Sequence, residues 1–176
     1  GSPSSTMKSS GDFDWSTVTA AATGSQGKLY RYAVAVETSA KLKADSSATT
    51  IAGVLNDPRS WTGSGDVRFA LVARSKADVK LYLASAATAA ELCGSDGSVA
   101  TSCTKGDVVV INAAGWKSGA AGYDGDKAGY RTYLVNHAIG QLLGKGNASC
   151  AGKGKKAPAM MQQSGDLRGC VANPWP

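Results

Sequence analysis

A chain of 176 residues, 43% hydrophobic and 18% charged, has the size and composition of one ordinary globular domain. These values exclude an intrinsically disordered chain, and no apolar run approaches the roughly 20 residues that a membrane-spanning helix needs. The net charge is +6, from 19 Lys and Arg against 13 Asp and Glu. This charge favours anionic partners over cationic ones.

The N-terminal segment differs in composition from the rest of the chain. Residues 1–27 are rich in Ser, Thr, Gly and Ala, and we expect a flexible linker or loosely held arm. Its opening Gly1-Ser2-Pro3 resembles a cloning remnant, so a signal peptide or anchor could precede the sequence. Order is expected to begin at Lys28, and residues 28–176 are expected to form a single domain.

Hydrophobic periodicity predicts a mixed α/β domain with a twisted mixed sheet and two main helices. The strands are expected at residues 30–37, 67–73, 79–84 and 108–112. The last of these is fully apolar, as in the middle of a sheet. The main helices are expected at residues 47–55 and 127–143, with a helical turn at 88–92.

Local signals predict where the helices begin and end. Ser46 or Ser47 is a plausible N-cap for the first helix, which should end near Pro58 because the residue before proline avoids the helical region. Residues 116–126 are expected to be a glycine-rich loop. Gly144 is well placed to end the second main helix. The remainder of the chain, to Pro176, is expected to be irregular.

Four cysteines lie in two local pairs, Cys93 with Cys103 and Cys150 with Cys170. Four cysteines allow three pairings, and free thiols are the alternative to disulfides. We favour the two local pairings, because each brackets a Gly/Ser/Lys-rich loop, and each closed loop could add about 2–4 kcal/mol. Disulfides indicate an oxidising compartment, hence a secreted or cell-surface protein.

The strongest motif is the sequence HAIGQLLGKGN, which begins at His137. It resembles the metzincin zinc-protease signature HExxHxxGxxH, in which three histidines bind zinc and the glutamate is the general base. In this alignment His137 matches the first ligand, and Gln141 and Asn147 stand at the other two ligand positions. Ala138 replaces the glutamate, and Gly144 is the helix-ending glycine.

Other segments extend the resemblance over most of residues 28–176. The sequence APAM, ending at Met160, is similar to the methionine turn beneath the metzincin zinc site. Further segments resemble a family of actinobacterial secreted or membrane-anchored metzincin-like domains of unknown function, whose typical members read HEVGH followed by GHGH. These segments are YRYAVAVE, NDPRSWTGSGDVRF, SCTKGDVVVIN, YRTYLVN and MMQQSGDLRGCVANPWP.

The resemblance implies a metzincin-like α/β (α+β) fold whose irregular C-terminal portion contains the Met-turn and is pinned by a disulfide. It also implies that the zinc site is lost. Neutral amide oxygens of Gln141 and Asn147 are poor zinc ligands beside imidazole or thiolate, and Ala138 supplies no base. We therefore expect no catalytic residues, no metal and no cofactor.

Two alternatives remain open. A peptidase or other hydrolase could use a remodelled, non-zinc site around His137, drawing on Ser118, Tyr123, Asp124 or Asp126, although no GxSxG elbow accompanies them. The chain could instead be an engineered inactive variant of a zinc metalloprotease, since glutamate-to-alanine is a common inactivating change. The joint Gln and Asn replacements fit natural divergence better.

The function expected from the sequence is an inactive pseudoprotease that serves as a secreted or cell-surface binding or scaffold module. Its partner would be a protein, a peptide or an anionic cell-wall ligand, and we expect a monomer. The densest basic cluster, Lys153, Lys155 and Lys156, contains no aromatic residue. A groove for single-stranded nucleic acid would combine basic with aromatic side chains, so no specific nucleic-acid binding is expected.

Overall fold

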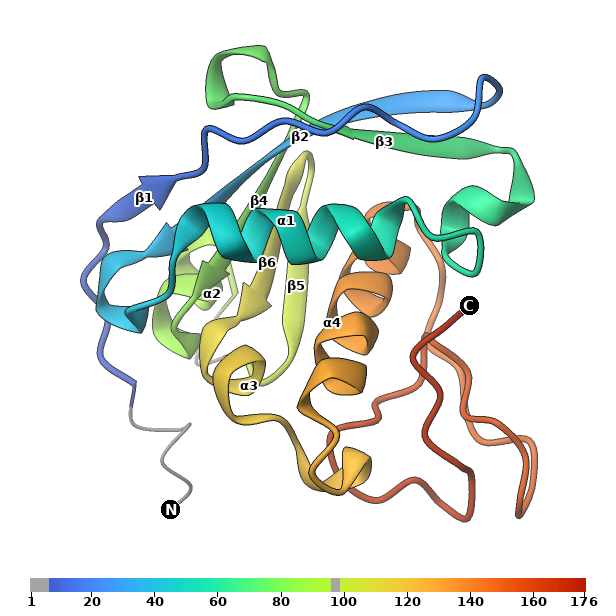
Figure 1. The fold of residues 1–176 in the computed structure, drawn as a ribbon. Helices are drawn as coiled ribbons and strands as arrows, with labels where there is room; N and C mark the ends of the chain where they lie inside the picture. Colours follow the sequence, from blue (N-terminus) through green and yellow to red (C-terminus); the bar gives the residue numbers. More distant parts are fainter. Residues whose placement is uncertain (1–6, 96–98) are drawn as a thin grey trace.

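The computed structural model describes residues 7–95 and 99–176 as a mixed α/β domain (Figure 1). The strands are β1 (Phe13–Trp15), β2 (Lys28–Glu37), β3 (Val67–Leu71), β4 (Val79–Ala84), β5 (Ser102–Lys105) and β6 (Val108–Asn112). The α-helices are α1 (Ala44–Leu55), α2 (Ala86–Cys93), α3 (Ala113–Ser118) and α4 (Lys127–Leu142).

The strands form one mixed sheet in the order β1-β2-β4-β6-β5, with β3 paired to the first half of β2. The neighbours β2, β4 and β6 run parallel. At the two ends of this order, β1 and β5 pair antiparallel with β2 and β6. The strand β6, apolar except for its last residue, therefore lies inside the sheet, as its sequence predicts.

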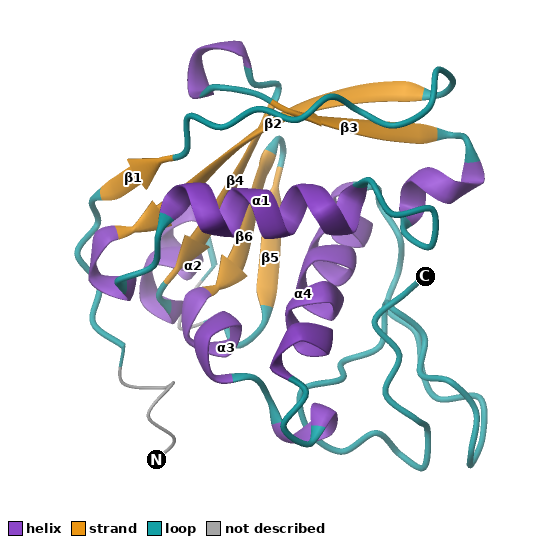
Figure 2. Cartoon of the chain, in the orientation of Figure 1, coloured by secondary structure: helices purple, strands orange, loops and turns teal. Residues whose placement is uncertain are grey.

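Alternate residues of the central strands face two different layers. Val34 and Leu81 belong to the larger core, which α1 and α4 complete on one face of the sheet (Figure 2). Ala35 and Tyr82 belong to a smaller core with Ala89 of α2. Because both faces are covered, the parallel strands are apolar on both sides.

The elements agree with the sequence analysis in most places and differ at one helix cap, one loop, one strand and the N-terminal segment. The helix α1 begins at Ala44 with Lys43 as its N-cap, so the prediction of Ser46 or Ser47 as cap is wrong, and both lie inside the helix. The predicted loop over residues 116–126 is wrong in part, because α3 continues into it as far as Ser118. The Asn112 side chain caps this helix by accepting the N–H of Ala114 and of Gly115. The short strand β5 lacked a recognisable alternation and was not predicted.

The N-terminal segment is part of the sheet, which differs from the expected linker. From Met7 onward it packs on the domain, and β1 pairs with the end of β2. Phe13 and Trp15 of β1 pack edge-on against Tyr82, with ring centroids 5.0 and 5.5 Å apart. Two aromatic side chains within a polar segment supply the apolar contact that holds it. Residues 1–6 of the expected linker lie outside the described residues.

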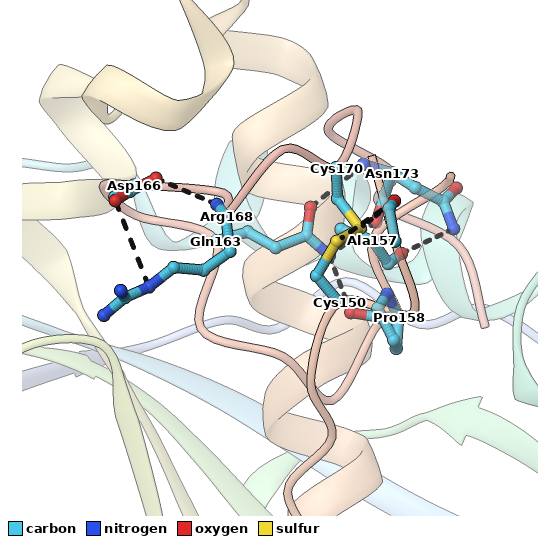
Figure 3. The surroundings of a disulfide bond; sticks show 9 residues. Cys150, Ala157, Pro158, Gln163, Asp166, Arg168, Cys170 and Asn173 are labelled. Carbon is cyan, nitrogen blue, oxygen red and sulfur yellow. Dashed lines mark hydrogen bonds and ion pairs between the residues drawn. A yellow bond between two sulfur atoms is a disulfide. The ribbon is translucent and has the colours of Figure 1, made fainter. Parts of the chain in front are cut away.

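Both predicted disulfides are confirmed, Cys93–Cys103 and Cys150–Cys170. Around Cys150–Cys170 the C-terminal portion is irregular but densely hydrogen-bonded (Figure 3). The Gln163 amide donates to the carbonyls of Pro158 and Asn173, both at 2.8 Å, and accepts from the Asn173 N–H. One buried amide thus replaces regular secondary structure in joining three segments. Among the helices of the described ranges, none has the length and apolarity to cross a membrane.

A buried carboxylate joins the end of β2 to the N-terminal segment and to α2. Glu37 has no exposed surface and accepts the backbone N–H of Ser10, of Gly11 and of Ser85, together with the Thr88 hydroxyl. Burial raises the pKa of Glu37, but the hydrogen bonds to the charged form outweigh it, and the net pKa is lowered. The charged form is therefore the one that the fold requires.

Replacing this carboxylate gives a test. We expect Glu37→Gln to lower the free energy of unfolding at pH 7 by about 2 kcal/mol, because a neutral amide loses charge-assisted hydrogen bonds. The folded pKa lies below the unfolded one, so the contribution is full above the ordinary glutamate pKa of about 4.3 and is lost as pH falls through the folded value.

Urea unfolding at pH 7 and at about pH 3 measures this difference, since both values bracket the ordinary glutamate pKa. The gap between wild type and Glu37→Gln should narrow at the lower pH. Glu91→Gln, at an exposed position of α2, is the matched control and should change little. An equal gap at both pH values would contradict the role given to the charge.

Candidate functional site

The C-terminal end of α4 brings the motif residues into one region. His137 and Gln141 are one turn apart and share a face of the helix. After Leu142 the chain leaves the helix: Gly144 has a φ of 79°, its N–H bonds the Gln141 carbonyl at 3.1 Å, and the Lys145 N–H bonds the Gly140 carbonyl at 2.9 Å. This is a Schellman ending, which favours glycine at the left-handed position.

The chain then returns towards a turn that lies against α4. The Met161 N–H bonds the Pro158 carbonyl at 3.0 Å and closes a turn over residues 158–161. The Ala148 N–H bonds the Met160 carbonyl at 3.2 Å. Asn147, which precedes Ala148 and is exposed, is therefore held at the same turn.

The turn packs directly on the backbone of α4. A Cβ added at Gly140 would overlap the sulfur of Met160 and the ring of Trp61. Met160 itself is buried. Glycine at position 140 is what allows the turn and the helix to approach this closely.

His137 is fully buried and held by this turn. Its Nδ1 lies 2.8 Å from the Ala159 carbonyl oxygen. A carbonyl can only accept, so Nδ1 carries the proton and Nε2 keeps its lone pair. Burial lowers the pKa of His137, and the Ala159 hydrogen bond offsets this only in part. The imidazole is therefore neutral at pH 7.

One side-chain amide lies near Nε2 of His137, and further hydroxyl and amide groups are linked to it or to the same face of α4. The amide nitrogen of Gln162 lies 3.4 Å from Nε2, and Thr101 donates to the amide oxygen of Gln162 at 3.0 Å. Ser102, at the start of β5, donates to the amide oxygen of Gln141 at 2.8 Å. We call these five residues the His137 cluster. It joins α4, β5 and the C-terminal portion through one imidazole and neutral polar groups.

The chemistry available to this cluster is limited. In residues 7–95 and 99–176, no group of three or more His, Cys, Asp or Glu side chains is arranged to hold a metal ion. Ala138 is fully buried in the core, and its methyl side chain cannot act as a base beside His137. The cluster offers hydrogen-bond donors and acceptors without a charge.

The residues considered for a remodelled hydrolytic site do not gather at His137. Asp126 caps the N-terminus of α4 by accepting the Gly129 N–H, and 11 residues of helix place it about 16 Å from His137 along the axis. The buried hydroxyl of Tyr123 donates to Gln163 at 2.8 Å. Ser118 and Asp126 line a separate cavity of about 740 Å³. No hydrogen bond between described residues connects Ser118 or Asp124 to His137.

Sequence reasoning missed three members of the cluster, namely Thr101, Ser102 and Gln162. Thr101 and Ser102 precede and begin a short edge strand that had no clear pattern. Gln162 directly follows the predicted methionine turn, and this position was the one indication in the sequence that it lies near His137. Its contact with His137 depends on how the turn packs, which no local pattern encodes.

The fold and the site define a disulfide-bonded mixed α/β domain with a polar site built around a single neutral histidine. The chain belongs to the family described as "Protein of unknown function (DUF3152)", which matches residues 1–169. No curated protein and no solved structure matches the chain.

The protonation of His137 can be tested directly, because the chain contains one histidine. We expect ¹⁵N-detected NMR at pH 7 to show a neutral imidazole with the proton on Nδ1, and a titration midpoint below the ordinary value of 6.5. The same residue in urea-unfolded protein, as control, should titrate at the ordinary value. A proton on Nε2 would contradict the hydrogen bond to Ala159.

Proposed function

We propose that this domain is a catalytically inactive, metzincin-like pseudoprotease that acts as a secreted or cell-surface binding module. The observation that carries the proposal is the state of His137. Its Nδ1–H bonds a backbone carbonyl at 2.8 Å, while Nε2 keeps its lone pair. Metal-binding histidines are usually oriented by this kind of second hydrogen bond. The Nε2 atom of His137 is thus oriented as in a metal-binding histidine, but the site contains no second histidine to bind the same metal.

The path of the chain after α4 supports the same proposal. Metzincins need a helix that presents two ligands one turn apart, then a glycine bend that brings the third ligand back. Here Gly144 makes the bend, and the returning segment with Asn147 is hydrogen-bonded to the turn around Met160. We interpret that turn, packed beneath His137, as the Met-turn. On this proposal the scaffold is retained, and the departures fall on the chemical groups.

Those departures account for the proposed loss of activity. Gln141 and Asn147 offer neutral amide oxygens, which bind zinc far more weakly than imidazole. The amide oxygen of Gln141 also already accepts from Ser102. Without a glutamate at position 138, a bound water would lack its general base.

A binding role suits the groups that remain. On its outer side β5 has no partner strand among the described residues, and an extended peptide can add to such an edge. Ser102 of β5 lies beside Gln141, so a peptide there would meet the amides and hydroxyls of the His137 cluster. The two disulfides are consistent with an extracellular location.

Metal content is the first test of this proposal. We expect purified protein to contain well below one zinc per chain, and chelators to leave its melting temperature unchanged, because a single imidazole and two amides hold zinc weakly. Elemental analysis and thermal unfolding with and without EDTA measure this. One tightly held zinc per chain would overturn the pseudoprotease proposal.

Rebuilding the site is the second test. We expect Gln141→His with Asn147→His to place three imidazoles around one point and to bind zinc. Zinc at about a thousandfold excess over its dissociation constant should then stabilise the fold by about 4 kcal/mol. Both positions are in contact with solvent, so the substitutions should leave the core intact.

A matched variant controls for added histidines. Thr132→His with Ser149→His adds the same number at positions outside the cluster and should show no zinc-dependent stabilisation. A folded Gln141→His, Asn147→His variant that gains no stability with zinc would mean that α4 and the returning segment do not have metzincin geometry.

A further inference from the structure

The positive charge of the chain is concentrated in its last segment. Residues 145–176 contain five of the 19 basic residues and one of the 13 acidic residues. They therefore hold +4 of the net +6, although they are less than a fifth of the chain. Lys153, Lys155, Lys156 and Arg168 are all exposed. Within the described chain, the three lysines form no ion pair, while Arg168 lies 4.0 Å from Asp166.

These basic residues lie on two paired segments, residues 150–157 and 166–171, which we call the basic finger. Cys150–Cys170 closes its base (Figure 3). The Gly154 N–H bonds the Gly169 carbonyl at 2.8 Å, and a Cβ added at Gly169 would lie 3.4 Å from the Cα of Lys153. The two sides of the finger are therefore in contact, and Lys153 lies beside the segment that carries Arg168. A preformed surface loses little conformational entropy when it binds.

The finger also carries an apolar side chain on its outer face. Val171 is 56% exposed, and it is the one large hydrophobic residue classed as exposed in the described part of the chain. It forms a parallel bridge with Lys156, and bridge partners project to the same face. The adjacent Ala157 and Cys170 are buried, as the alternation of side chains along a strand requires. Lys156 and Val171 thus project outward together.

We propose that the basic finger is a docking surface for an anionic phospholipid bilayer. Lysine and arginine side chains near such a surface are attracted to its headgroups, and an apolar side chain between them can enter the boundary between headgroups and acyl chains. The combination distinguishes this partner from a soluble polyanion, which would bind the charges but gain nothing from an exposed valine. The interaction is independent of the His137 cluster.

Vesicle co-sedimentation tests the proposal with the intact domain. Vesicles of phosphatidylcholine with about 30% phosphatidylglycerol supply the negative surface potential that the finger requires. We expect binding to these vesicles, none to pure phosphatidylcholine, and loss of binding at about 1 M salt, where the Debye length is about 3 Å. The triple variant Lys153→Gln, Lys155→Gln, Lys156→Gln should bind at least about tenfold more weakly. Val171→Ser should also weaken binding.

Matched variants separate the finger from net charge. Lys8→Gln, Lys43→Gln, Lys76→Gln removes the same charge at exposed positions elsewhere and should retain most binding, as should Lys153→Arg, Lys155→Arg, Lys156→Arg. Equal weakening by both glutamine variants would overturn the proposal. The proposal would also be overturned if the wild-type protein did not bind anionic vesicles, or if it bound soluble polyphosphate but not vesicles.

Discussion

A stripe of buried polar side chains on α4 holds the C-terminal portion of the domain in place. Tyr133 donates to the Met161 carbonyl at 2.7 Å, and burial raises the pKa of this hydroxyl so that it stays protonated. Asn136 donates to the Pro174 carbonyl and accepts from Ser60, and His137 bonds Ala159. Unpaired, such groups would each cost about 1–3 kcal/mol in the interior. The helix and the irregular portion therefore require each other.

The same constraint makes the His137 cluster rigid. The turn around Met160 is fixed by the helix that carries His137, so His137 and the turn cannot move independently. The proposed binding site and the basic finger both draw on this portion of the chain. One is formed by neutral groups against a sheet edge, and the other by charged groups on two parallel segments joined by a disulfide. They suit different partners, a peptide and a bilayer.

Sequence patterns predicted the elements whose stability is local or strongly periodic. Strands β4 and β6, helix α4 and both disulfides were predicted closely, because alternation, helical spacing and cysteine proximity are visible over a few residues. The place of the N-terminal segment was not, since Phe13 and Trp15 act through contacts with Tyr82, far along the chain. The members of the His137 cluster contributed by Thr101, Ser102 and Gln162 were missed for the same reason. Their partners are distant in sequence, and hydroxyl and amide side chains have no spacing rule.

The hydrogen bond from His137 to the Ala159 carbonyl makes this histidine harder to lose than its neighbours. Its acceptor is a main-chain oxygen at a buried position. A side-chain substitution at position 159 therefore leaves the acceptor in place unless it moves the backbone. Gln141 and Asn147 touch solvent and carry no comparable penalty. On the proposed ancestry, genetic drift would erase the solvent-facing ligands first and spare the one that also serves folding. On that proposal, the hydrogen bond that His137 supplies to the native fold would retain it after catalysis was lost.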